Sequence, residues 1–302
     1  MKKRILAVKC IISLFLLVFF FRWVGFERIV DTLKGAEPVN LALGCLTLLL
    51  IPVTKSFRFL YLASLLKLRI NPTQCFLTHM IVPIIGMMTP GKLGEGLKIF
   101  MLKSSKKTLG FSFLTERILD ITALIIAAGL GITTIHYSLT VYLAIIIAVI
   151  IAVICFIKLD KLLNVLTRMV LKKEYFPQDW FLEQSKLLLT PGGFILVLLT
   201  IVVWLLTFGV GYFFIQSMGL TLSYTQAVQT FSWSILIGIV SGLPGGHGIR
   251  EMSIAYLLKE LYGISEVLGG SVAVLNLISH FVVLGLTGLL GYLAYSILNK
   301  QE

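Results

Sequence analysis

Two short stretches share one pattern and organise the rest of the sequence. Residues 90–95 read Pro-Gly-Lys-Leu-Gly-Glu, and residues 244–251 read Pro-Gly-Gly-His-Gly-Ile-Arg-Glu. Each contains P-G-x-x-G followed by an acidic residue, and each comes after a short apolar segment. Proline and glycine end a helix, glycine permits a tight turn, and the next helix begins with unpaired backbone N–H groups. The pattern therefore predicts two helical hairpins.

The composition places these hairpins in a membrane. The chain has 302 residues, of which 58% are hydrophobic and 13% charged, with a mean hydropathy of +0.97. Soluble domains carry roughly 25% charged residues, so a large soluble domain is excluded. The sequence contains eight apolar segments, at residues 5–21, 41–59, 73–88, 113–135, 139–157, 194–216, 227–243 and 267–297.

Two of these segments are short for the roughly 20 residues of a full span. Segments 73–88 and 227–243 contain Pro or Gly and precede the two turns, so we expect both to begin re-entrant hairpins. Such backbone is tolerated at membrane depth where it is buried in protein or lines a wet cavity. The first segment lacks a small-residue cleavage site and is expected to remain as a span. The predicted fold is an all-α polytopic membrane protein with about six full transmembrane helices and two re-entrant hairpins.

The charge distribution predicts the orientation. The chain carries 26 Lys and Arg against 14 Asp and Glu, a net charge of +12. With both termini in the cytoplasm, seventeen of these cations fall on cytoplasmic segments and four on the opposite side, as the positive-inside rule requires. The predicted location is the cell (inner or plasma) membrane. Because topology accounts for most of the surplus, no nucleic-acid partner is expected.

The same topology predicts an internal repeat within a single domain of residues 1–302. The first hairpin enters from the cytoplasm and the second from outside, which is typical of inverted repeats whose broken helices meet near the midplane. The first repeat covers about residues 37–157 and the second about residues 194–298. Between them, residues 158–193 form the largest polar stretch, with apolar residues at helical spacing that indicate an amphipathic helix at the cytoplasmic interface.

The hairpin turns hold the candidate ligand site. Helix N-termini carry partial positive charge and attract anions, and cationic or protonatable side chains lie beside them. A charge at membrane depth costs about 2.5–3.5 kcal/mol, so a functional role is the first interpretation. The alternative is that Lys92–Glu95 and Arg250–Glu251 pair and hold the hairpins in shape. The candidate headgroup-binding residues are Lys92, Lys98, His247, Arg250, Gly91, Gly94, Gly245, Gly246 and Gly248.

A second charged group begins the span after the first hairpin. Glu116 and Asp120 share a helix face and Arg117 can pair with Asp120, so they form either a structural clamp or part of the site, in reach of Lys92 or Lys98. Glu95, Glu251 and His280 are candidates for charge balance or proton coupling. Near the end of the second apolar segment, Lys55 and Arg58 are expected to be interface anchors or headgroup contacts. No metal or cofactor is expected, since the four cysteines form no C-x-x-C pair.

Taken in order, P-G-x-x-G-E, E-R-x-x-D and P-G-G-x-G-x-R-E resemble the lysylphosphatidylglycerol synthase transmembrane (flippase-like) family over nearly the whole chain. The resemblance implies a membrane protein that moves a lipid with a charged headgroup between leaflets. In the synthases this domain is fused to a cytosolic aminoacyltransferase, so a stand-alone member is expected here. Members often carry Arg in the last span where this chain has His280. The matching residues are Pro90, Gly91, Gly94, Glu95, Glu116, Arg117, Asp120, Pro244, Gly245, Gly246, Gly248, Arg250 and Glu251.

Three hypotheses about function follow. The first is a lipid flippase or transporter for an aminoacyl-phosphatidylglycerol-like or polyprenyl-phosphate-linked lipid, with a separate lipid-synthesising enzyme and a homodimer as possible partners. The second is a membrane-embedded lipid-modifying enzyme, or an accessory subunit of a phosphatidylglycerol lysyltransferase. The sequence lacks H-E-x-x-H, G-x-S-x-G and P-loop motifs, which disfavours an enzyme. The third is a small-solute transporter.

Overall fold

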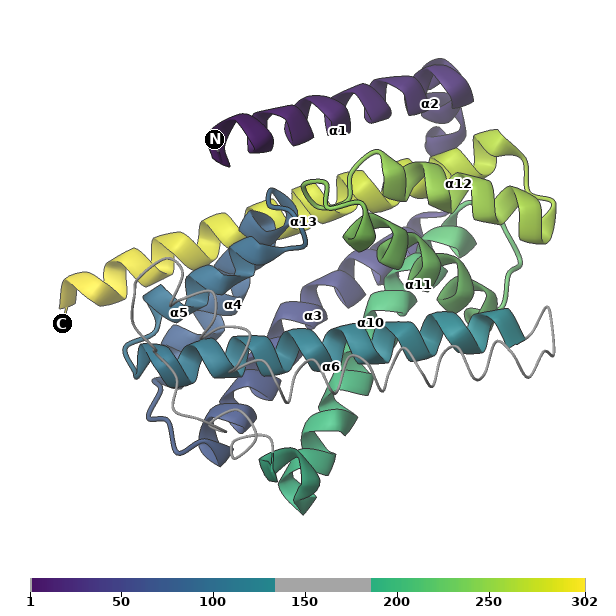
Figure 1. The fold of residues 1–302 in the computed structure, drawn as a ribbon. Helices are drawn as coiled ribbons and strands as arrows, with labels where there is room; N and C mark the ends of the chain where they lie inside the picture. The colour runs from purple at the N-terminus through teal and green to yellow at the C-terminus, as the bar shows by residue number, and fades with distance from the viewer. Residues whose placement is uncertain (1, 134–185, 302) are drawn as a thin grey trace.

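The structure of the chain, a computed structural model, describes residues 2–133 and 186–301 (Figure 1). The predicted span 139–157 and most of the amphipathic segment 158–193 lie outside these residues. Within the described ranges every regular element is helical. The α-helices are α1 (Lys2–Val24), α2 (Phe26–Lys34), α3 (Pro38–Leu65), α4 (Pro72–Met87), α5 (Lys98–Met101), α6 (Lys106–Thr133), α10 (Pro191–Ser217), α11 (Tyr224–Val240), α12 (Ile249–Tyr262) and α13 (Glu266–Gln301). The 3-10 helices are η1 (Leu93–Leu97) and η2 (Lys186–Leu189).

The helix starts follow from local capping chemistry. Proline is the first residue of α3, α4 and α10, where its missing N–H costs nothing. The side chains of Glu37, Asn71 and Thr190 precede these prolines and accept hydrogen bonds from first-turn N–H groups. At α11, Ser223 and Gln226 form a reciprocal capping box. These caps explain why the observed helices begin within a few residues of the predicted apolar segments.

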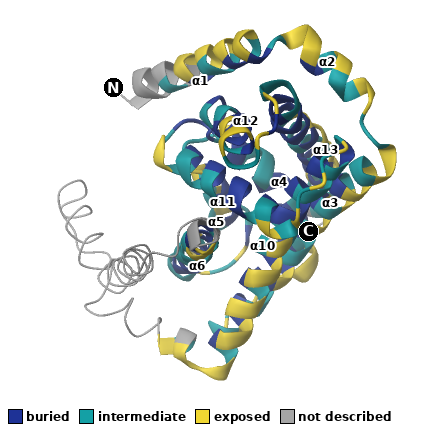
Figure 2. Cartoon of the chain, turned by 90° about the vertical axis from the view of Figure 1, so that its right-hand side faces the viewer, coloured by how far each residue is buried: buried dark blue, intermediate teal, exposed yellow. Residues whose placement is uncertain are grey.

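Three of the described helices are long and apolar enough to cross a membrane: α3, α10 and residues Glu266–Leu298 of α13. Large apolar side chains on their surfaces are exposed, including Leu198 and Leu205 of α10 and Leu290 of α13. Exposed residues also cover the outer face of α1, while α4 and α11 are largely buried (Figure 2). Such wide exposed apolar surface is unusual for a soluble monomer and suits contact with lipid chains.

The two predicted hairpins are present and their turns touch. The first runs from α4 through residues 88–92 into η1 and α5, and the second runs from α11 through residues 241–248 into α12. Pro90 and Pro244 form an isolated antiparallel bridge, and Gly245 N–H donates to the Thr89 carbonyl oxygen at 3.2 Å. In Figure 1 the turns after α4 and α11 lie close together, beneath α1. Residues about 154 positions apart in sequence therefore form one junction.

The first hairpin departs from its prediction in the returning arm. A helix was expected to begin after the turn, but the chain forms η1 and then the single turn of α5. Gly94 and Gly96 disfavour a regular α-helix here, and Gly94 N–H instead donates to the Thr89 hydroxyl at 2.7 Å. The returning arm of the second hairpin is the regular 14-residue α12. The hairpins match in their turns and differ in the helices that follow.

Helix α1 packs against the second turn and forms hydrogen bonds with its backbone. The Lys9 ammonium donates to the Gly242 carbonyl oxygen at 2.8 Å, and the Ser13 hydroxyl donates to the His247 carbonyl oxygen at 2.8 Å. A side chain on Gly248 would meet Leu16 Cβ at 2.6 Å, so the turn and α1 are in close contact. Lys9 is thus at a structural contact that the sequence pattern did not assign.

Gly246→Ala is expected to destabilise the second turn. Gly246 has φ +73°, and an added Cβ would lie 2.8 Å from Gly238 Cα, which is backbone and cannot rotate away. We expect the free energy of unfolding to fall by about 1–3 kcal/mol, measured by thermal unfolding in detergent. The control is Gly110→Ala in α6, where a Cβ meets nothing within 4 Å. Equal midpoints for both variants would show that the turn tolerates a side chain.

Candidate functional site

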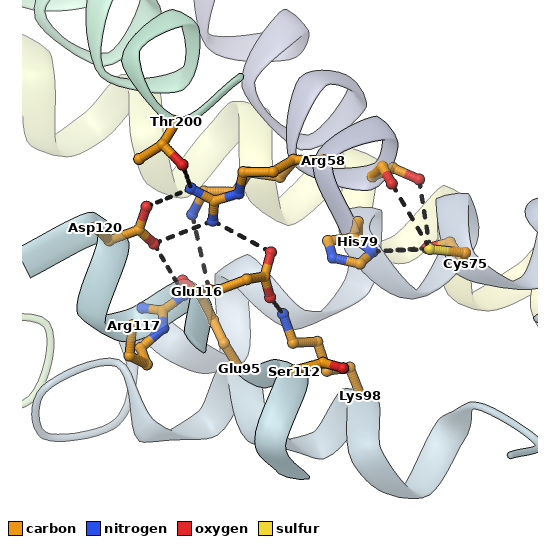
Figure 3. Close-up of polar contacts among 12 residues, drawn as sticks. Arg58, Cys75, His79, Glu95, Lys98, Ser112, Glu116, Arg117, Asp120 and Thr200 are labelled. Carbon is orange, nitrogen blue, oxygen red and sulfur yellow. Dashed lines mark hydrogen bonds and ion pairs between the residues drawn. The ribbon is translucent and has the colours of Figure 1, made fainter. Parts of the chain in front are cut away.

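A fully buried arginine lies at the centre of the charged interior. Arg58 of α3 has 0% exposure, and its guanidinium reaches α6 and α10 (Figure 3). Its Nη1 donates to Asp120 Oδ1 at 2.6 Å and to the Thr200 hydroxyl at 3.3 Å, and its Nη2 donates to Glu116 Oε1 at 3.2 Å. The expectation that Arg58 anchors the chain at the membrane interface is therefore wrong, because its charge is neutralised inside the protein.

Lys98 completes a charge-balanced group. Its ammonium forms an ion pair with Glu116, and it lies 4.6 Å from the centre of the Phe59 ring, close enough for a cation–π contact. We call Arg58, Lys98, Glu116 and Asp120 the clamp. It has two cations and two carboxylates, and it joins α3, the first hairpin and α6. The predicted contact with Lys98 is confirmed for Glu116, while Asp120 contacts Arg58 and Arg117 instead.

Glu95 lies beside the clamp and is shared between two other cations. Arg117 Nη2 is 2.5 Å from Glu95 Oε2 and 3.7 Å from Asp120 Oδ2, and Lys55 Nζ is 3.7 Å from Glu95 Oε2. The predicted Arg117–Asp120 pairing is thus present. Lys55 is only 15% exposed and pairs with Glu95, so it does not anchor the chain at the interface, while the alternative of a headgroup contact stays a prediction.

Lys92 does not pair with Glu95, contrary to one interpretation of the motif. It adopts a left-handed conformation with φ 58° in the turn, and its half-buried ammonium forms no hydrogen bond or ion pair with the described residues. It is nevertheless within electrostatic range of Lys55, Glu95, Arg117 and Arg250. Lys92 is therefore a cation without a direct partner at the junction of the two turns.

In the second turn, Arg250 does not pair with Glu251 either. Glu251 Oε2 instead accepts the Gly248 N–H at 2.6 Å, and its Oε1 lies 3.8 Å from His247 Nδ1. Arg250 is 8% exposed, and its buried Nε has no hydrogen-bond partner in the part of the chain that the structure describes. The same holds for both ring nitrogens of the buried His247. Two polar side chains of this turn are therefore buried with unused hydrogen-bonding capacity, which is uncommon in folded proteins.

The glycine N–H groups of the turns are mostly occupied. Gly94 donates to Thr89 Oγ1, Gly245 to the Thr89 carbonyl and Gly246 to the Leu243 carbonyl, as Gly248 does to Glu251. The expectation of free N–H groups is not met at these positions. Gly91, with φ +58°, supplies turn geometry. Side-chain cations, more than backbone donors, thus define the candidate site in this conformation.

His280 of α13 lies near the junction of the two turns. Its Nδ1 is 2.7 Å from the Asn276 carbonyl oxygen, and the ring is within electrostatic range of Lys92, His247 and Arg250. Because the Nδ1 contact is with the backbone of its own helix, the ring orientation is fixed. Among residues 2–133 and 186–301, no group of three or more His, Cys, Asp or Glu side chains is arranged to hold a metal ion.

An apolar groove adjoins the clamp. It has a volume of about 660 Å³ and lies between α6, α10 and α11, with Ala123, Ile201 and Val228 in its walls. Thr200 also lines it, and the same hydroxyl accepts the hydrogen bond from Arg58. The apolar groove and the clamp are therefore in direct contact at Thr200.

These features define a helical membrane protein in which two hairpins bring charged side chains together inside the bundle. A family model described as "Lysylphosphatidylglycerol synthase TM region" matches residues 6–288, and the chain belongs to this family. It is a multi-pass membrane protein.

One curated relative is similar over a shorter stretch. A "UPF0104 membrane protein" of Methanothermobacter thermautotrophicus is 31% identical over 87 residues, which cover 29% of this chain and 26% of the relative. The match thus spans about a quarter of the relative's length.

Proposed function

We propose that the protein moves a lipid with a phosphate-containing headgroup between the two leaflets. The observation that carries the proposal is the junction of the two turns, where, among the described residues, no carboxylate pairs with Lys92 or Arg250 and none forms a hydrogen bond with the His247 ring. Charges held inside a membrane protein are costly unless they are compensated. A lipid phosphate supplies that compensation, and Arg is well suited to bind it.

The apolar groove supports a lipid as the ligand. When a lipid headgroup binds near the charged residues, its hydrocarbon chains need an apolar surface nearby. The groove provides such a surface next to the clamp. A small polar solute has no use for such a surface. The groove therefore favours lipid transport over the small-solute alternative, with the acyl chain of the transported lipid as its occupant.

The proposed membrane topology places the two hairpins on opposite sides of the bilayer. Six full spans and two re-entrant hairpins, with both termini cytoplasmic, place the hairpins on opposite sides, so that their tips meet within the bilayer. The contact between Pro90 and Pro244 supports this arrangement. The repeats comprise residues 37–157 and 194–298 of a single domain, and a separate enzyme supplies the lipid.

The test is a transport assay on the purified protein in liposomes that contain a headgroup-labelled anionic lipid. Transfer of label between leaflets should exceed that of liposomes with heat-inactivated protein, with no chemical change in the lipid. Chemical turnover of the lipid would instead support a lipid-modifying enzyme. Background-level transfer of phosphatidic acid, phosphatidylglycerol and lysyl-phosphatidylglycerol would contradict the proposal.

Ala123→Trp is expected to slow transport by filling the groove. Ala123 lines the groove on α6, and an indole at this position overpacks the groove. We expect a free-energy cost of about 1–3 kcal/mol, which corresponds to a transport rate that is roughly ten- to hundred-fold lower. The matched control is Ala42→Trp at an exposed position of α3, which should transport at the wild-type rate. An unchanged rate for Ala123→Trp would remove the groove from the transport mechanism.

A further inference from the structure

The charged residues of the interior divide into a neutral group and a positive group. The clamp, defined above, is balanced, and its two cations are at most 2% exposed. The remaining group lies around the two turns and is called the tip group. It contains four cations and two carboxylates, namely Lys55, Lys92, Arg117, Arg250, Glu95 and Glu251.

The tip group therefore carries a surplus of two positive charges. Neither His247 nor His280 offers a negative charge to offset it. Arg117 and Lys55 both converge on the single carboxylate Glu95, and Glu251 is engaged by the Gly248 N–H. No other carboxylate of the described residues forms an ion pair with this group except Asp120, at 3.7 Å from Arg117, and Asp120 already neutralises Arg58.

The cations of the tip group are also more accessible than the two cations of the clamp. The side chains of Lys55 and Arg117 are 15% and 18% exposed, against 0% for Arg58. Lys92 is half-buried at the tip of the first turn, and Arg250 faces the same junction from the second hairpin with a buried, unpaired Nε. A ligand can thus reach part of a cluster whose counter-charge is not supplied by residues 2–133 and 186–301.

We infer that the lipid bound at this site has a headgroup that ends in a phosphate monoester. The inference rests on the proposed lipid transport and narrows its substrate. A phosphate monoester carries a charge of about −1.5 to −2 at neutral pH and presents three acceptor oxygens, which matches the surplus of the tip group. Arg250, whose guanidinium forms no ion pair with the described residues, can donate two parallel hydrogen bonds to such a group, while Lys92 acts as a point charge.

Two other headgroups fit the charge less well. A phosphodiester such as phosphatidylglycerol carries a single negative charge and leaves half of the surplus uncompensated. An aminoacylated phosphatidylglycerol adds ammonium groups beside Lys55, Lys92, Arg117 and Arg250, where like charges repel. The site therefore selects against the aminoacylated lipid that the family name suggests.

The test compares binding of four probes at pH 7.5 to the purified wild-type protein in a neutral detergent. These are dioleoyl phosphatidic acid, dioleoyl phosphatidylglycerol, lysyl-phosphatidylglycerol and inorganic phosphate, and the readout is the shift of the thermal unfolding midpoint with ligand concentration. We expect phosphatidic acid to bind at least about tenfold more tightly than the other two lipids, in line with its stronger charge-assisted hydrogen bonds. Lys92→Gln and Arg250→Gln should remove the preference, and Lys34→Gln on the exposed face of α2 should keep it.

Each other outcome overturns the inference. Equal binding of phosphatidic acid and phosphatidylglycerol, or tighter binding of the lysyl lipid, excludes a monoester preference even where liposome transport occurs. Equal stabilisation by inorganic phosphate at the same concentration means that the site binds a free anion and not a lipid. Failure of the proposed function is recognised separately, because transport then stays at background for every lipid. If a variant fails to fold, the lipid panel on the wild-type protein alone still decides the preference.

Discussion

The double variant Lys92→Gln/Arg250→Gln should reduce lipid transport to the level of liposomes with inactivated protein. Each residue is expected to contribute a charge-assisted contact with the lipid phosphate, worth about 1.5–3 kcal/mol, so each single variant should transport roughly ten- to hundred-fold more slowly. The assay is the transfer of headgroup-labelled lipid between leaflets in proteoliposomes.

The same variant should fold as well as the wild-type protein. Neither cation forms an ion pair with the described residues, so its removal leaves no buried carboxylate unpaired. Their loss relieves the repulsion between Lys92 and Arg250, and it also removes the longer-range attraction of Lys92 to Glu95 and of Arg250 to Glu251. Because these effects oppose each other, the thermal unfolding midpoint in the absence of lipid should be close to that of the wild-type protein. A lowered midpoint would mean that the cations stabilise the turns.

A matched control separates the site from the overall charge. Arg28→Gln/Lys34→Gln also removes two positive charges, but from exposed positions on α2. There Lys34 pairs with Asp31, and both side chains are 72% exposed. Exposed pairs contribute little to stability. This control should transport at the wild-type rate. Wild-type transport by the Lys92 and Arg250 variant, or loss of transport by the control, would exclude the junction as the headgroup site.

The sequence predicted the helices and the turns because local chemistry decides them. Long apolar segments require helices in a membrane, and the P-G pairs require turns, so α3, α4, α10, α11 and α13 appear close to the predicted bounds. The touching of the hairpin tips was also expected from their opposite directions of entry. Their turns need glycine at positive φ, as observed at Gly91, Gly245 and Gly246.

The sequence could not predict the partners of the charged residues. Spacing favoured Lys92–Glu95, yet the left-handed backbone at Lys92 breaks helical spacing, and Glu95 pairs with Arg117, 22 residues away. Arg58 was assigned to the interface because it lies near the end of the second apolar segment, whereas α3 continues to Leu65 and carries Arg58 inside the protein. The motif E-R-x-x-D has two acids and one arginine, and this excess acid was the available signal that a further cation such as Arg58 was needed.

Arg58→Met is expected to cause the largest loss of stability. Removing this guanidinium leaves Asp120, and in part Glu116, as buried carboxylates without their main partner, which costs about 3–5 kcal/mol. Asp120→Met should also be damaging, because Arg58 at 0% exposure then keeps only Glu116, which it shares with Lys98. The measurement is the free energy of unfolding in mixed detergent micelles.

The double variant Arg58→Met/Asp120→Met should recover most of that loss. It removes one cation and one carboxylate together, and Lys98–Glu116 and Arg117–Glu95 remain as pairs. Thr200 also stays satisfied, since its hydroxyl donates to the Leu196 carbonyl oxygen at 2.9 Å. The expected coupling energy is about 2–3 kcal/mol. The exposed pair Asp31–Lys34, changed to methionine in the same cycle, should give a coupling energy below about 1 kcal/mol.

The same double variant decides whether the clamp is structural. Because the clamp is neutral and inaccessible while the tip group is positive and partly accessible, we expect the double variant to transport lipid at a rate close to that of the wild-type protein. A double variant that regains stability but transports no lipid would place Arg58 and Asp120 in the transport mechanism. A double variant less stable than either single variant would show instead that the ion pair does not account for the cost of the single substitutions.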